Sequence, residues 1–139
     1  MTQEHTIRQA YINSLLDGGF TRLRDKTTNP TEGYIVGGLT EATTMPEDKY
    51  HPDFNTTYER TSRATNHYAQ FTKLWHKYEM QLDEMPFPSG LGVGTWIHEE
   101  KIYFDLVQRI YSLNVATMVA KERGEIAIYD CANQKEILL

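Results

Sequence analysis

One stretch of this sequence constrains its fold more than any other: apolar side chains recur between residues 58 and 83 at alternating intervals of three and four. This spacing places them along one face of an α-helix. At 1.5 Å per residue the helix would be ~36 Å long, so we expect it to lie across a sheet or to reach another subunit. Pro86 and Pro88 end it, because proline cannot continue a helical hydrogen-bond ladder. The apolar stripe consists of Thr61, Ala64, Tyr68, Phe71, Trp75, Tyr78 and Leu82, widened by Leu74.

The segment before this helix predicts one shorter helix and two strands. Apolar residues on a single face indicate a helix over about residues 6–17, which Gly18-Gly19 ends because glycine reaches positive φ without steric cost. The runs 20–23 and 33–39 predict strands, and the simplest pairing joins them in a long hairpin. Residues 40–57 show no periodicity and contain two prolines and four acidic residues, so we expect an exposed polar connection.

The last third of the chain, residues 90–139, predicts a ββαββ module. One strand is expected before the turn Glu99-Glu100 and one after it. The expected helix has Ser112 as its N-cap residue and Gly124 as its C′ residue. We therefore predict a single α+β domain over 1–139: an antiparallel sheet with helices packed on one face and one long central amphipathic helix. The expected elements of the module are strands at 91–98, 101–107, 126–129 and 135–139 and a helix at 113–123.

Charge and hydropathy exclude several classes of function. A formal net charge of −5 leaves no general basic surface for nucleic acid. No apolar run approaches the ~20 residues that a membrane span needs, and the N-terminal residues lack the apolar region of a signal peptide. Cys131 is the only cysteine, so no internal disulfide can form. We expect a cytoplasmic protein with neither a membrane nor a nucleic acid as partner.

The motifs of common catalytic and metal sites are missing from the sequence. The five histidines form no H-E-x-x-H pattern, and no serine stands in a G-x-S-x-G turn. Gly90, Gly92 and Gly94 open a strand instead of a helix, so they do not form a phosphate loop. These glycines flatten one strand face, which can admit a helix aromatic such as Trp75 or Phe71, or a planar ligand ring. We expect no catalytic residue, no metal site and no cofactor.

Aromatic and polar residues in the C-terminal module favour ligand binding. Alternation places Asp105 on the same strand face as Tyr103, with Trp96 across the hairpin. An aspartate flanked by rings suits a hydroxyl or amine ligand, although Asp105 can also have a structural role, capping backbone groups or pairing with Arg109. A hydrolase centred on Asp105 would need a second titratable group, which the sequence does not identify. Guanidinium groups bind phosphate, which adds two arginines to the candidates. The candidate ligand-binding residues are Trp96, Tyr103, Asp105, Arg109, Trp75 and Arg63.

Short motifs near both ends of the chain point to a group of proteins. They are Gly-Gly-Phe-Thr at 18–21, Pro-Thr-Glu-Gly-Tyr-Ile-Val at 30–36, Gly-Thr-Trp at 94–96, Tyr-Phe-Asp at 103–105 and Ala-Ile-Tyr-Asp at 127–130. With them the chain resembles small uncharacterised proteins encoded by phages, prophages and their bacterial hosts. The resemblance covers the first 35 and the last 48 residues, whereas residues 40–88 depart from it.

The resemblance implies a phage or prophage accessory protein that acts in the host bacterial cytoplasm. Accessory proteins of this size include small α+β homo-oligomers that sequester nucleotide-derived immune signals, such as the Thoeris anti-defence sponges. By analogy we expect a non-enzymatic homo-oligomer that binds a nucleotide-like small molecule at a subunit interface. The alternative is a protein–protein inhibitor that docks on a host defence enzyme through the helix 58–83.

Overall fold

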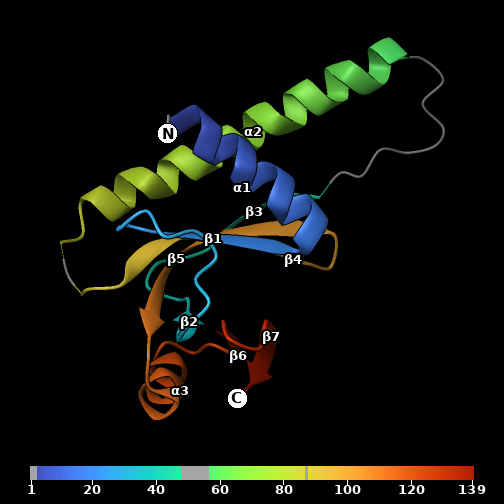
Figure 1. Cartoon of the computed structure of the whole chain (residues 1–139). Helices are drawn as coiled ribbons and strands as arrows, with labels where there is room; N and C mark the ends of the chain where they lie inside the picture. Colours follow the sequence, from blue (N-terminus) through green and yellow to red (C-terminus); the bar gives the residue numbers. More distant parts are fainter. Residues whose placement is uncertain (1–2, 48–56, 87) are drawn as a thin grey trace.

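Three helices and a single sheet make up the described part of the chain (Figure 1). The computed structural model describes residues 3–47, 57–86 and 88–139, and within them the side chains of 6–47, 66–86 and 88–139. The elements in chain order are α1 (Gln3–Asp17), β1 (Gly19–Leu23), β2 (Tyr34–Val36), β3 (Thr43–Pro46), α2 (Thr57–Asp83), β4 (Leu91–His98), β5 (Lys101–Ile110), α3 (Leu113–Glu122), β6 (Ala127–Asp130) and β7 (Lys135–Leu138).

The sheet is antiparallel throughout and is built around β5. Its strand order is β1-β4-β5-β2-β6-β7, and β3 pairs with β5 in addition. β3 pairs with the first half of β5, where Thr43 lies opposite Phe104, and β2 pairs with its end, where Val36 lies opposite Gln108. β2 and β3 therefore follow each other along one side of β5. The connection between them, residues 37–42, passes the middle of that strand.

The main core lies between the sheet and the two helices α1 and α2. Phe71, Trp75 and Tyr78 of α2 are completely buried against Phe104 and other apolar residues of β4 and β5. Adjacent rings lie in contact, with centroids 6.1 Å apart for Phe71 and Trp75 and 4.9 Å apart for Phe71 and Phe104. The predicted apolar stripe is thus confirmed for the described side chains, and α2 lies across its own sheet (Figure 1).

A second, smaller core lies under α3. Ala116 and Ala120 of this helix pack on Val36 and Ile128 of β2 and β6, with Ile110 at the margin. Because side chains alternate along a strand, Ile110 lies on the same pleat face of β5 as the residues beneath α2. The helix begins as predicted, since Ser112 Oγ accepts a hydrogen bond of 3.3 Å from the Val115 N–H. The α+β fold with an antiparallel sheet is confirmed.

Two expectations for the N-terminal half are wrong. β1 does not form a hairpin with β2; it pairs with β4, and β2 lies between β5 and β6. Part of the expected exposed connection is the strand β3, which buries the side chain of Met45 in the main core. Both errors concern pairing with strands from the C-terminal half, which local patterns cannot reveal. Residues 48–56 of the expected connection lie outside the described residues.

The flattened glycine face of β4 is occupied by the sheet itself. A Cβ atom at Gly92 would lie 2.8 Å from the Cα of Leu23, in the backbone of β1, and one at Gly94 would lie 2.8 Å from a methyl carbon of Val107. Trp75 and Phe71 pack against the opposite face, so they do not fill the space above the glycines.

No helix in the described part of the chain has both the length and the apolar character to span a membrane.

Candidate functional site

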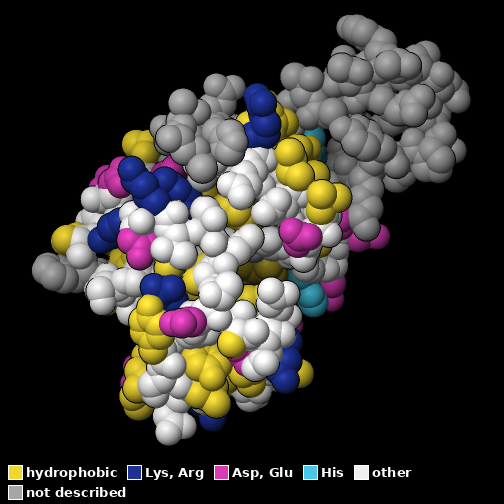
Figure 2. All heavy atoms as spheres, in the orientation of Figure 1, with side chains coloured by type: hydrophobic (Ala, Val, Ile, Leu, Met, Phe, Trp, Pro, Cys, Tyr) yellow, Lys and Arg dark blue, Asp and Glu magenta, His cyan; other side chains and the backbone are white. Residues whose placement is uncertain are grey.

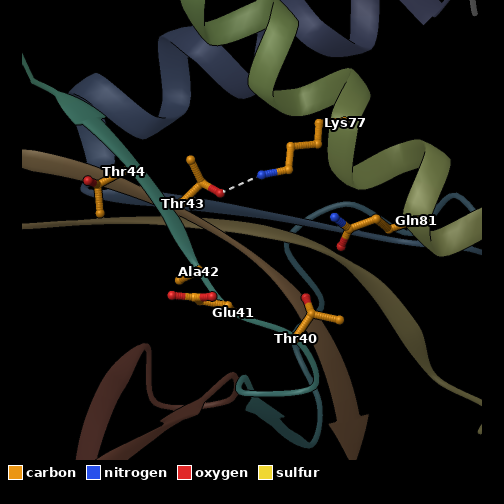
Figure 3. A pocket seen from close by; sticks show the side chains of 7 residues that line it. All are labelled: Thr40, Glu41, Ala42, Thr43, Thr44, Lys77 and Gln81. Carbon is orange, nitrogen blue, oxygen red and sulfur yellow. Dashed lines mark hydrogen bonds between the residues drawn. The ribbon is translucent and has the colours of Figure 1, made fainter.

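A polar hollow opens between the β2–β3 connection and α2 (Figure 3). Its volume is about 580 Å³, within the range of roughly 300–1,000 Å³ typical of small-molecule sites. Lys77 and Gln81 extend into it from α2, four residues apart and hence on one face of the helix. The lining residues are Thr40, Glu41, Ala42, Thr43, Thr44, Lys77 and Gln81.

A chain of hydrogen bonds holds the connection against α2 on one side of the hollow. Lys77 Nζ donates to Thr43 Oγ1 over 2.9 Å, and that hydroxyl lies 2.7 Å from the Tyr78 hydroxyl. The Tyr78 O–H in turn donates to the carbonyl oxygen of Glu41 over 2.7 Å. Burial raises the pKa of Tyr78 above its ordinary value, so its phenol keeps the proton for this bond.

Two side chains that line the hollow, those of Thr40 and Gln81, each have a buried oxygen without a hydrogen-bond partner among the described residues. These atoms are Thr40 Oγ1 and Gln81 Oε1. Buried polar atoms are nearly always hydrogen-bonded, because an unsatisfied one costs about 1–3 kcal/mol. The hollow therefore combines unused hydrogen-bonding capacity with one ammonium group, on Lys77, and one carboxylate, on Glu41.

A pair of carboxyl groups secures the other end of the β2–β3 connection. Asp105 of β5 is 2% exposed, and its Oδ2 accepts a hydrogen bond of 2.8 Å from the Gly38 N–H. A Cβ atom at Gly37 would lie 2.5 Å from Asp105 Oδ2 and 2.7 Å from Glu125 Oε1. The two acidic side chains thus enclose Gly37, where only glycine leaves them room.

Burial is the main influence on the proton affinity of the Asp105 carboxyl. Burial, with a contribution from the neighbouring Glu125, raises the pKa of Asp105 to about 6, although the Gly38 hydrogen bond and Arg123 oppose the shift. Burial also raises the pKa of Glu125 above its ordinary value. Arg123 donates to the carbonyl of Gly37 over 3.4 Å and to Gln108 Oε1 over 2.7 Å. Glu125 is therefore the second titratable group that the sequence did not identify.

The arrangement of Asp105 and Glu125 favours a clamp over an open acid–base site. The carboxylate of Asp105 is turned to the backbone at Gly38 and is sealed from solvent. Residues 37–43 are thus fixed at one end by Asp105 and at the other by Tyr78. The segment that lines the hollow is therefore held by hydrogen bonds to a buried side chain at each end.

The sequence-predicted site residues do not converge on one place. Trp96 and Tyr103 stack with centroids 5.1 Å apart and ring planes 7° apart, and both are half-buried. Arg109, near the end of β5, lies over the ring of Tyr111 at 4.8 Å. Trp75 is completely buried in the main core. Asp105 lies on the same face of β5 as Tyr103, but its carboxyl group is hydrogen-bonded to the backbone of Gly38. The side chain of Arg63 on α2 lies outside the described residues.

The residues that form the hollow were missed in the sequence. The available signal was the spacing of Lys77 and Gln81 on one helix face beside Tyr78 of the apolar stripe. Their partner residues 40–44 have no recognisable pattern, because it is the pairing of β3 with β5 that brings them to α2. The sequence also offered a pairing of Asp105 with Arg109. In the structure the cation beside Asp105 is Arg123 instead.

Metal binding and thiol chemistry find no support in the described residues. No group of three or more His, Cys, Asp or Glu side chains among them is arranged to hold a metal ion. The Cys131 thiol is buried, and burial raises its pKa to about 11, so little reactive thiolate forms near neutral pH.

Comparison of the chain with protein-family models, with curated proteins and with solved structures gives no match. The resemblance to phage-encoded proteins therefore stays a prediction from the motifs alone.

Proposed function

We propose that this protein is a non-enzymatic binder of a small nucleotide-like molecule, and that the hollow between residues 40–44 and α2 holds the ribose-phosphate part. One observation carries the proposal: the two side chains that have a buried oxygen without a partner, Thr40 and Gln81, line the same hollow as Lys77.

The donors and acceptors in the hollow suit such a ligand. The Lys77 ammonium group can pair with a phosphate oxygen, as compact cationic side chains do in many phosphate sites. The Gln81 Oε1 and the Glu41 carboxylate are acceptors for ribose hydroxyls, the role that acidic residues have in dinucleotide sites. The Thr40 hydroxyl can both donate and accept. The ligand would thus lie beside both side chains that have an unpartnered oxygen.

Binding without turnover is favoured by the composition of the lining. Among the described residues, Glu41 has the only carboxyl group that lines the hollow, and no histidine or cysteine accompanies it. General acid–base hydrolysis needs two positioned proton carriers. The Asp105–Glu125 pair has two, but Asp105 is 2% exposed.

The motif resemblance supplies the biological setting of the proposal. A phage or prophage accessory protein that binds a nucleotide without converting it would remove an immune signal from the host cytoplasm, as an anti-defence sponge does. The inhibitor hypothesis makes a different prediction, since a protein docked on α2 would leave the hollow without a role.

The decisive experiment is a thermal-shift titration with ADP-ribose, cyclic ADP-ribose and cyclic dinucleotides, followed by chromatography of the recovered nucleotide. At a hundred times its Kd, a ligand adds about 2.7 kcal/mol of stability, which raises the Tm by about 8 °C for a domain of this size. We expect Lys77→Met to weaken binding about tenfold, because a charge-assisted contact is lost. Lys73→Met, one turn away on α2 and outside the hollow, is the matched control and should bind normally.

Three results would count against the proposal. No nucleotide in the panel raises the Tm, Lys73→Met and Lys77→Met weaken binding equally, or the nucleotide is recovered as a cleaved product. The last result would establish a hydrolase.

A further inference from the structure

Most of the large hydrophobic side chains that are exposed in the described chain lie on residues 111–139, the part of the C-terminal module that holds α3, β6 and β7. Large hydrophobic side chains that are exposed elsewhere in the described chain are limited to Ile12, Leu16 and Met80. Figure 2 shows hydrophobic side chains gathered over the lower part of the molecule, where Figure 1 places α3, β6 and β7. Exposed apolar surface concentrated in this way marks an interaction site. The exposed large hydrophobic residues in this part of the chain are Tyr111, Leu113, Val115, Met118, Ile126, Tyr129, Leu138 and Leu139.

The same module ends the sheet with an open strand edge. β7 is the last strand in the order and pairs on one side only, with β6, so its outer side presents backbone groups that another strand can pair. Leu139 N–H donates to the carbonyl of Ile126 over 3.0 Å. This bond brings three exposed apolar side chains, those of Ile126, Leu138 and Leu139, to one end of the open edge.

We propose that β7 pairs in antiparallel fashion with β7 of a second copy of this chain, so that two sheets continue into one across a two-fold axis. Pairing satisfies the open backbone groups and covers Leu138 and Leu139. A second copy is the fitting occupant because its β7 offers the same open edge, and one symmetric register pairs the whole strand without placing like charges opposite each other.

The charges on β7 select that register. A two-fold axis perpendicular to the sheet keeps each side chain on its own face, so the symmetric registers are centred on a single residue. Centring on Lys135 or Glu136 places two like charges opposite each other, which is unfavourable. Centring on Leu138 leaves Lys135 and Glu136, half of β7, outside the strand pair. Centring on Ile137 pairs the whole strand and places Glu136 opposite Leu138 of the other copy.

This register also joins the hydrophobic interiors of the two copies. Ile137 is partly buried and packs against the small core under α3. When it lies opposite Ile137 of the second copy, the two small cores become neighbours across the axis. The association would therefore add apolar burial where the single chain has little.

The test is the molar mass from light scattering during size exclusion, together with a charge-swap pair. We expect a particle of twice the 16.1 kDa chain mass for the wild type. Leu138→Glu would place a carboxylate opposite Glu136 of the other copy, twice per dimer, and should raise the dimer Kd at least tenfold. Adding Glu136→Lys in the same chain restores opposite charges and should restore the dimer. Both positions are exposed, so neither change should disturb the fold.

Leu16→Glu is the matched control, because Leu16 is 78% exposed on α1, outside the C-terminal module. It should leave the dimer unchanged. A wild-type particle of single-chain mass at all concentrations, or a dimer that Leu138→Glu leaves intact, would overturn the proposal. Nucleotide binding in the hollow does not depend on either outcome, since no residue of β7 lines it.

Discussion

The two cores that lie beneath the helices differ in both size and closure. Under α1 and α2, the rings of Phe71, Trp75 and Tyr78 are fully buried. Under α3 the buried residues are small or aliphatic, and several large apolar side chains of the same module point to solvent. We expect the aromatic core to provide most of the stability, and the exposed apolar side chains beside the smaller core to serve the association proposed above.

Shortening one residue in each core tests this division most strongly. Trp75→Ala should lower the free energy of unfolding by about 4 kcal/mol, because it leaves a large cavity among packed rings. Ile128→Ala removes fewer atoms from a smaller cluster, and we expect a loss of about 2 kcal/mol. Urea denaturation of both variants measures the difference. Equal losses would mean that the two cores contribute alike.

The carboxyl pair at the junction of the two regions should make stability depend on pH. The pKa of Asp105 is raised to about 6 in the folded protein, against an ordinary value of 3.8. The folded state therefore binds the proton more tightly than the unfolded state does. Its stabilising contribution, about 3 kcal/mol at 1.36 kcal/mol per pKa unit, is complete below about pH 4 and is lost as the pH rises through 6.

Asp105→Asn should remove this dependence. The amide keeps an acceptor for the Gly38 N–H and stays neutral, so the variant should be more stable than the wild type at pH 8, by up to about 3 kcal/mol, and similar at pH 4. Urea denaturation at both pH values measures it. Asp83→Asn, at an exposed position on α2, is the control and should retain the wild-type pH dependence. A wild-type stability that does not fall between pH 4 and pH 8 would contradict the assignment.

The regular elements could be predicted because their signals are local. The spacing of Phe71, Trp75 and Tyr78 fixes the buried face of α2 without knowledge of what covers it. The hairpin of β4 and β5 is equally local, since a two-residue turn joins two strands of alternating pattern. Ser112 and Gly124 mark the ends of α3 through backbone requirements of single residues.

The sheet order and the site could not be predicted because they depend on distant pairings. β3 has no alternation that marks it as a strand, and only β5 and the buried side chain of Met45 give it a place. Glu125 meets Asp105 although twenty residues separate them, because α3 returns the chain to the β2–β3 connection. The hollow forms for the same reason, since Thr43 reaches Lys77 only when β3 is paired.

The hydrogen bonds of Tyr78 connect the aromatic core to the hollow and can be tested separately from packing. Tyr78→Phe keeps the ring but leaves the Glu41 carbonyl and the Thr43 hydroxyl without this partner. We expect a stability loss of about 1.5 kcal/mol and a several-fold weaker nucleotide affinity in calorimetric titration, because the connection loses one anchor. Tyr68→Phe, at a half-buried position on the same helix, should leave affinity unchanged. Unaltered affinity in Tyr78→Phe would show that the core does not position the hollow.

The smallest effect addresses whether the two regions unfold together. Ser112→Ala removes the N-cap of α3, which costs about 1 kcal/mol in typical helices. If the C-terminal module opens independently, amide hydrogen exchange should accelerate about fivefold in α3 and β6 and remain unchanged in the buried part of α2. Equal acceleration in α2 would mean that the module opens only with the whole chain. In that case the small core would be part of a single cooperative unit, and the two regions would differ in size and exposed apolar surface but not in when they unfold.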